Sequence, residues 1–134
     1  NNRSQMQKTD SNVLIVDAYN ANPTSMAAAL DNFSLFEASH KVALLGDMRE
    51  LGADSVFEHI KVLREAEGLG IDSIYLVGEE FHKALVNVGQ RPNVQWYATS
   101  EELATAIHSN PLKDCMVLVK GSRGTTMEKV IPEL

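Results

Sequence analysis

The chain lacks the features that mark secreted, membrane-spanning and nucleic-acid-binding proteins. One cysteine among 134 residues cannot form an internal disulfide, so the expected compartment is the reducing cytoplasm. No apolar run approaches the roughly 20 residues that a membrane helix needs, so membrane insertion is not expected. Lys and Arg number 12 against 18 Asp and Glu, and the resulting net charge of −6 argues against nucleic acid as a main partner.

Motifs for metal and phosphate binding are also missing. The four histidines lie far apart without the spacing of a metal site, and the phosphate-loop pattern GxxxxGK[ST] occurs nowhere. No metal ligands are therefore predicted, and Cys115, which leads into an apolar run, is interpreted as a buried structural thiol. An apolar content of 44% is enough for one domain with a hydrophobic core.

Short apolar runs alternate with amphipathic segments along the whole chain. The runs predict strands at 13–16, 42–45, 74–77, 94–97 and 116–119. Residues 4–9 and the turn Asp10-Ser11-Asn12 predict a hairpin whose first arm is an antiparallel edge strand. The alternation predicts an α/β fold, a three-layer sandwich of about six mostly parallel strands with helices on both faces.

Capping patterns predict where the helices begin. Asn22 and Pro23 suit the N-cap and the first position of a helix. Three pairs have the capping-box spacing and predict further helix starts: Ser55 with Glu58, Thr99 with Glu102, and Thr125 with Glu128. The last of these helices is expected to bury one apolar face, made of Met127, Val130, Ile131 and Leu134.

Polar residues follow the carboxyl ends of the predicted parallel strands, which share one edge of the sheet. The segments expected to meet there are 17–22, 46–47, 78–80 and 120–123. Asp17 could bind a ribose, hold a metal or cap the next helix, and Asn22 is favoured as a plain N-cap. Tyr19 and Asn20 fit either a docking site or an ordinary turn.

The loop Lys120–Thr125 predicts an anion site. Its two glycines let the backbone approach a ligand, successive N–H groups and the dipole of the expected last helix attract negative charge, and Lys120 and Arg123 add cations. A tight turn with solvated basic residues is the alternative. Asp47 and Glu50 could reach a metal or a ligand amine, although a polar loop explains them slightly better.

Three segments together resemble the C-terminal domain of the Mur ligase family: 17–26 (DAYNANPTSM), 46–52 (GDMRELG) and 119–123 (VKGSR). The likeness is to the members that join D-alanyl-D-alanine to UDP-N-acetylmuramoyl-tripeptide. It implies a Rossmann-like domain at 4–134, preceded at 1–3 by the end of an interdomain linker. It also implies that the N-terminal and central ATPase domains of such a ligase are absent from this chain.

The resemblance carries a reaction and a set of roles. ATP with Mg²⁺, held mainly by the central domain, phosphorylates the tripeptide carboxylate, and the D-alanyl-D-alanine amine attacks the acyl phosphate; this domain alone would be inactive. Nucleotide contacts are implied for Arg3, Asp17, Asn20 and Asn22. Substrate contacts are implied for Lys120, Gly121, Ser122 and Arg123, with less certain roles for Tyr19, Asp47 and Glu50.

Two other functions fit a doubly wound domain of this size. One is a receiver-like phosphoacceptor module, and the other is a stand-alone nucleotide-binding module. A receiver places its acceptor aspartate after the third strand, where this chain has Gly78.

Overall fold

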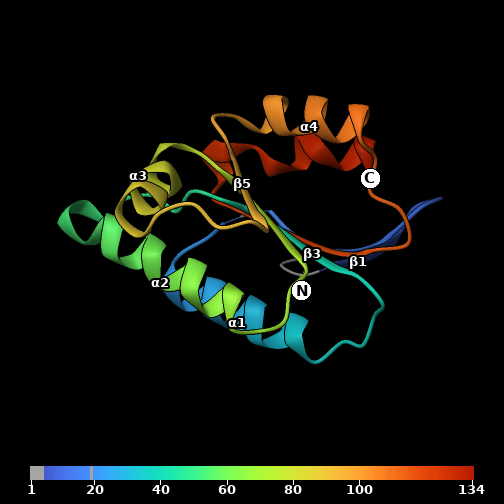
Figure 1. The fold of residues 1–134 in the computed structure, drawn as a ribbon, viewed down its shortest axis with the longest axis horizontal. Coiled ribbons are helices and arrows are strands. Elements are labelled where there is room, and N and C mark those ends of the chain that lie inside the picture. Colours follow the sequence, from blue (N-terminus) through green and yellow to red (C-terminus); the bar gives the residue numbers. More distant parts are fainter. Residues whose placement is uncertain (1–4, 19) are drawn as a thin grey trace.

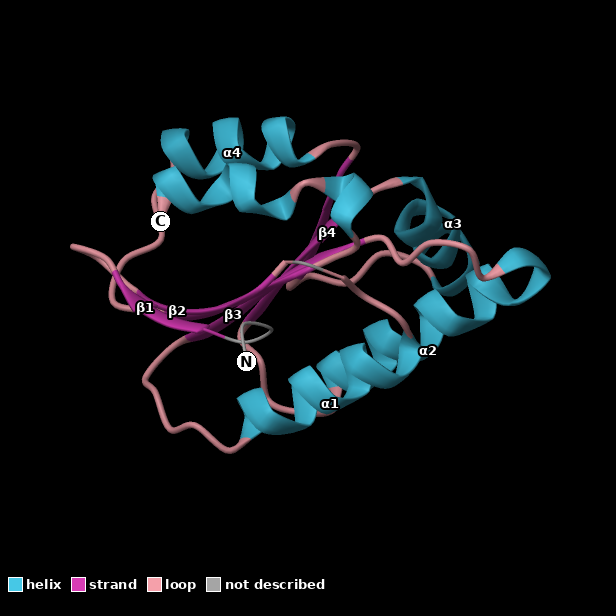
Figure 2. Cartoon of the chain, turned by 180° about the vertical axis from the view of Figure 1, so that it is seen from behind, coloured by secondary structure: helices cyan, strands magenta, loops and turns pink. Residues whose placement is uncertain are grey.

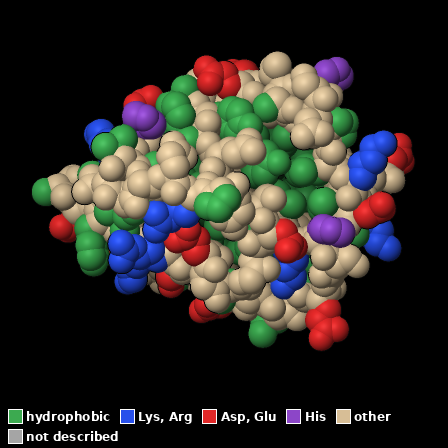
Figure 3. All heavy atoms as spheres, in the orientation of Figure 1, with side chains coloured by type: hydrophobic (Ala, Val, Ile, Leu, Met, Phe, Trp, Pro, Cys, Tyr) green, Lys and Arg blue, Asp and Glu red, His purple; other side chains and the backbone are tan. Residues whose placement is uncertain are grey.

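The computed structural model describes residues 5–18 and 20–134, so the expectations for Arg3 and Tyr19 lie outside the described residues. A twisted sheet lies between two layers of helices (Figure 1). Viewed from behind, the sheet separates the layer of α1 and α2 from the layer that contains α4 (Figure 2). Acidic and basic side chains intermingle over the face in Figure 3. No helix in the described part of the chain is long and apolar enough to cross a membrane.

The sheet confirms the predicted mixed topology. Its strands are β1 (Gln5–Lys8), β2 (Val13–Asp17), β3 (Lys41–Gly46), β4 (Ser73–Val77), β5 (Val94–Tyr97) and β6 (Met116–Lys120). Their spatial order is β1-β2-β6-β3-β4-β5, with β1 antiparallel to β2 and all other neighbours parallel. The last strand in sequence is therefore inserted between β2 and β3, which brings its carboxyl end to the middle of the sheet edge.

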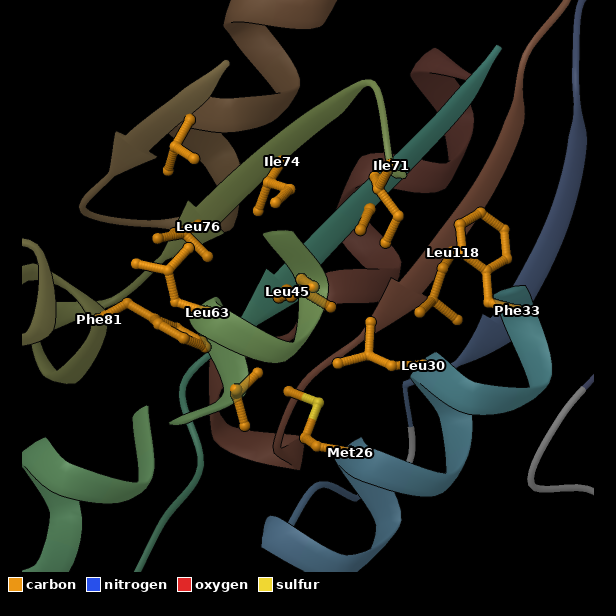
Figure 4. Close-up of a cluster of buried hydrophobic side chains, with 14 of the residues drawn as sticks. Met26, Leu30, Phe33, Leu45, Leu63, Ile71, Ile74, Leu76, Phe81 and Leu118 are labelled. Atoms are coloured by element: carbon orange, nitrogen blue, oxygen red, sulfur yellow. The ribbon is translucent and has the colours of Figure 1, made fainter. Parts of the chain in front are cut away.

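One face of the sheet is covered by α1 (Pro23–Ser34), α2 (Ser55–Glu67) and α3 (Glu79–Val88). Side chains from these helices interdigitate with the strands below them (Figure 4). The fully buried members include Met26, Leu30, Phe33, Leu63 and Phe81. Burial of apolar surface at about 25 cal/mol per Å² is what holds this layer to the sheet.

The other face is covered by α4 (Ser100–Ser109) and the C-terminal 3₁₀ segment η3 (Met127–Glu133). Leu103 and Ile107 of α4 pack with Met127, Val130 and Leu134 against the opposite side of the strands. The predicted apolar face of the last segment is therefore buried as expected, apart from Ile131, which is half-buried.

The prediction of a last α-helix is wrong. Residues Arg123–Thr125 (η2) and η3 are 3₁₀ turns, and Thr126 between them has the left-handed φ of 49°. A residue with positive φ cannot sit inside an α-helix, and Pro132 removes a further backbone donor. Thr125 instead closes a turn, because its Oγ1 donates to the Ser122 carbonyl at 2.7 Å.

The other predicted helix starts divide into two kinds. Asn22 caps α1 and exchanges hydrogen bonds with Ser25, and Thr99 Oγ1 accepts from the Glu102 N–H, so both N-caps are confirmed. The prediction that Ser55 is an N-cap in a capping box is wrong, because the N-cap of α2 is Asp54 and Ser55 lies inside the first turn. Another short 3₁₀ turn, η1 (Gly52–Asp54), leads into that helix.

Candidate functional site

The four polar segments do meet at the carboxyl edge of the sheet. Asp17 and Lys120 are register partners at the ends of β2 and β6. The Ser122 N–H donates to the Asp47 carbonyl at 3.0 Å, and the Asp47 N–H donates to the Val77 carbonyl at 3.0 Å. These contacts join the ends of β6, β3 and β4 into one continuous rim, as the sequence predicted.

Asp17 and Lys120 form a buried ion pair. Lys120 Nζ lies 2.8 Å from Asp17 Oδ2 and donates a second hydrogen bond to the Asn20 carbonyl at 3.0 Å. The side chains are 1% and 10% exposed for Lys120 and Asp17. The ammonium is therefore not displayed at the surface, and a direct contact between Lys120 and a substrate stays a prediction.

The turn after β2 is held by its own side chains. Asn20 Oδ1 accepts from the Ala21 N–H at 2.9 Å, and Asn22 Oδ1 accepts from the Ser25 N–H at 2.8 Å. Both amides are thus used in shaping the turn and starting α1. Their contacts with a nucleotide remain predictions.

Asp47 caps the N-terminus of α3. Its two carboxylate oxygens accept from the Glu80 N–H at 2.9 Å and the Phe81 N–H at 3.0 Å. Burial raises the pKa of this carboxyl, and the two backbone hydrogen bonds act in the opposite direction. Gly78 makes the contact sterically feasible, because a Cβ there would lie 2.3 Å from the carboxylate.

A buried histidine, missed by sequence reasoning, fixes the loop that carries Asp47. His59 is fully buried; its Nε2 accepts from the Met48 N–H at 3.0 Å, so Nδ1 donates to the Ser55 carbonyl at 2.8 Å. Ser55 Oγ donates to Glu80 Oε1 at 2.6 Å, and this bond, with one from Lys83, lowers the pKa of Glu80. The only signal for the role of His59 in the sequence was its spacing of four residues from Ser55.

The glycines of the 120–126 loop serve packing within the chain. A Cβ on Gly121 would lie 2.7 Å from side-chain atoms of Thr125 and Met127 and 3.0 Å from the Gly46 Cα. A Cβ on Gly124 would lie 2.4 Å from Arg49 Nη2. The expected support from a helix dipole is wrong, because residues 123–133 form 3₁₀ turns and not an α-helix. Anion binding by this loop stays a prediction.

A cavity of about 530 Å³ opens beside this loop, and we call it the rim pocket. It is bounded by the 47–52 loop, the starts of α3 and α4, and the 124–126 turn. Sequence reasoning placed Asp47 and Glu50 at the site but missed Arg49, Thr99, Ser100 and Thr126, which come from segments far apart in sequence.

Metal-binding groups do not gather in the described part of the chain. No three His, Cys, Asp or Glu side chains lie together there in a way that could hold an ion. Cys115 is half-buried rather than fully buried, its Sγ donates to the Lys113 carbonyl at 3.3 Å, and burial raises the pKa of the thiol.

A family model for the Mur ligase glutamate ligase domain matches residues 2–123. The chain belongs to the Mur ligase family. Among curated relatives it is 37% identical over 123 residues to the UDP-N-acetylmuramoyl-tripeptide–D-alanyl-D-alanine ligase of Treponema pallidum, covering 90% of this chain and 27% of that protein. The same ligase of Escherichia coli is 33% identical over 131 residues, with 96% and 28% covered.

Solved Mur ligase structures share the fold. A crystal structure of MurF from Acinetobacter baumannii matches with a TM-score of 0.82 at 32% identity, covering 98% of this chain and 29% of that one. MurF from Thermotoga maritima in complex with ADP matches with a TM-score of 0.80 at 22% identity, which supports the fold alone. The chain thus spans less than a third of the length of these relatives.

Proposed function

We propose that this Mur ligase domain is the C-terminal part of an ATP-dependent ligase that joins D-alanyl-D-alanine to UDP-N-acetylmuramoyl-tripeptide in peptidoglycan precursor synthesis. The observation that carries the proposal is the 37% identity to the T. pallidum ligase across 90% of the chain. Its partners in this role are the N-terminal and central domains of the same polypeptide, with residues 1–3 as the end of the linker and the cytoplasm as the compartment.

The chain's own residues fit only part of the nucleotide. Asp17 and Asn20 both contact the Lys120 ammonium where β2 meets the next turn. Their place at the end of a parallel strand supports a contact with the sugar side of a nucleotide. The described residues offer no acidic cluster for Mg²⁺. ATP supplies the phosphoryl group that activates the tripeptide carboxylate, and we assign no part of that transfer to this chain.

The domain contributes binding, orientation and exclusion of water. Closure of the rim over the reacting groups would hold the amine of the dipeptide near the activated carboxylate. Such positioning makes a bimolecular step effectively unimolecular. The rim pocket offers the volume for this second substrate, and its 124–126 wall directly follows residues 120–123, which the family resemblance associates with that substrate.

Phosphate release by the chain joined to its N-terminal and central domains tests the proposal. We expect release only when ATP, UDP-N-acetylmuramoyl-tripeptide and D-alanyl-D-alanine are all present. The 134-residue chain alone should release none, because it has no phosphate-binding loop. Turnover that is unaffected by omitting D-alanyl-D-alanine, or that is supported only by a different amino acid, would contradict the proposed substrate.

A further inference from the structure

Some of the charged side chains that line the rim pocket have a hydrogen-bond or ion-pair partner, and others have none among the described residues. Arg49 is the one Lys or Arg among the described residues that line it. Within the described part of the chain its guanidinium makes no hydrogen bond or ion pair. Its guanidinium lies against Gly124, where an added Cβ would be 2.4 Å from Nη2.

Three of the carboxylates in the same wall are already occupied. Asp47 accepts two backbone N–H groups of α3, and Glu80 accepts from Ser55 and Lys83. Glu101 is paired with Lys129, whose Nζ lies 2.7 Å from Oε2. These carboxylates are less available to a ligand, because their oxygens already accept hydrogen bonds from within the chain.

Two carboxylates remain without such a partner among the described residues. Glu50 and Glu79 line the pocket, and neither side-chain carboxylate makes a hydrogen bond or ion pair with the described residues. The pocket therefore presents one uncompensated cation, Arg49, and two uncompensated anions. A ligand that carries both a carboxylate and an ammonium group complements this arrangement better than a simple anion or cation does.

We propose that Arg49 binds the carboxylate of a small zwitterion in the rim pocket, with Glu50 and Glu79 facing its ammonium end. This rests on the proposed function, whose dipeptide substrate is such a zwitterion. A guanidinium can hold a carboxylate through two parallel hydrogen bonds, which fixes orientation as well as affinity. The cavity of about 530 Å³ is ample for a dipeptide.

The alternative cation in this region is Lys120, and the geometry disfavours it. Its side chain is only 1% exposed, and its ammonium donates to Asp17 and the Asn20 carbonyl. If Lys120 turned to bind a substrate, its buried ion pair with Asp17 would be broken, which is unfavourable. Arg49 is exposed and can bind without breaking an existing contact.

The test compares D-alanyl-D-alanine with D-alanyl-D-alaninamide, which lacks the carboxylate charge, in the complete ligase polypeptide. Arg49→Gln should raise KM for the dipeptide about 10- to 100-fold, the range for losing a charged hydrogen bond, with kcat nearly unchanged. KM for the amide should change less than about twofold. Arg64→Gln, an exposed arginine of α2 outside the pocket, is the matched control and should alter neither value.

A second variant moves the guanidinium without removing it. Gly124→Ala places a methyl group 2.4 Å from Arg49 Nη2, which is closer than two such atoms can approach, so the arginine must shift. We expect KM for the dipeptide to rise in the same direction, again with little effect on the amide. An unchanged KM in Arg49→Gln, or an equal rise for dipeptide and amide, would overturn the proposal.

Absence of ligase activity in the wild-type polypeptide would remove the proposed function but not decide the role of Arg49. In that case the ¹⁵N-labelled chain is titrated with the dipeptide and with its amide. Dipeptide-induced shifts at residues 47–52 and 124–126 that Arg49→Gln abolishes would support the proposal. Shifts that persist in the variant, or no shifts at all, would overturn it.

Discussion

Asp17 and Asp47 both lie where a buried parallel strand ends, yet the fold neutralises them differently. Asp17 contacts the ammonium of Lys120, whereas Asp47 accepts two backbone N–H groups from α3. The first arrangement depends on the insertion of β6 beside β2, and the second depends on the close approach of the β4–α3 turn to β3. A strand-end aspartate in a sequence therefore marks the rim without revealing what it binds.

The two halves of the rim differ in the same way. Around β2 and β6 the polar groups are buried and mutually paired, so this half is mainly a rigid support. Around β3 and β4 the pairing is less complete, and Arg49, Glu50 and Glu79 face a cavity. We therefore expect substitutions on the β3–β4 side to affect ligand binding, and substitutions on the β2–β6 side to affect mainly the stability of the fold.

Removing the lysine should have the largest effect on the paired half of the rim. Lys120→Met keeps the side-chain length but removes the ammonium that lies 2.8 Å from the buried Asp17 carboxylate, so the free energy of unfolding should fall by about 3–5 kcal/mol. Urea denaturation of the chain measures the change. The double variant Asp17→Asn with Lys120→Met should lose clearly less than the single one, and an equal or larger loss would show that the pair is not the cause.

Adding one methyl group tests the Asp47 half. Gly78 has φ of 114° and a Cβ there would meet the Asp47 carboxylate at 2.3 Å, whereas Gly89, with φ of 90°, has nothing within 4 Å of that position. Both Ala variants strain the backbone, but Gly78→Ala also displaces the cap. Urea denaturation should show it to be less stable than Gly89→Ala by about 2 kcal/mol; equal losses would leave backbone strain as the whole effect.

The smallest expected effect is a pH dependence at the Asp47 half. Because Ser55 and Lys83 lower the pKa of Glu80 from its ordinary 4.5, Glu80 stabilises the fold above that value and loses this contribution as the pH falls through the lowered pKa. Glu80→Gln should therefore cost less than about 1 kcal/mol at pH 7, because water screens the attraction between Glu80 and the exposed Lys83. The cost should become progressively smaller in acid. Asp47, with its raised pKa, contributes in the opposite sense, since its stabilisation is lost as the pH rises through that pKa.

Urea midpoints of wild type and Glu80→Gln between pH 3 and 7 measure this difference. Glu79→Gln is the control, because Glu79 is exposed and has no partner among the described residues. Its stability should follow the wild-type curve. A Glu80→Gln deficit that is constant across the range would contradict a role for the carboxylate charge.

Local patterns were enough to predict the elements but not their neighbours. The strands, the antiparallel first arm and the caps at Asn22 and Thr99 follow from periodicity and short-range hydrogen bonding, and the structure confirms them. The strand order does not follow, because pairing between β2 and β6 joins residues about a hundred positions apart. The capping pattern at Thr125 predicted a helix that does not form, because the pattern is local. The chain instead turns through the left-handed Thr126, and Met127 packs against Gly46 and Gly121.

The site shows the same division. The grouping of strand ends at one edge follows from parallel topology alone, and it is confirmed. The rim pocket could not be predicted from that topology, because its wall combines the 47–52 loop with the start of α4 and the 124–126 turn. No spacing rule links Arg49 to Gly124, although the fold places them in contact.

The single tryptophan gives the chain an internal optical probe. Trp96 Nε1 donates to the Gly78 carbonyl at 2.6 Å, and Gly78 also lines the rim pocket. Any ligand that displaces the start of α3 will change the polarity around the indole ring and therefore its fluorescence emission. Occupancy of the pocket can thus be followed by intrinsic emission in a titration, with no dye attached and no residue replaced.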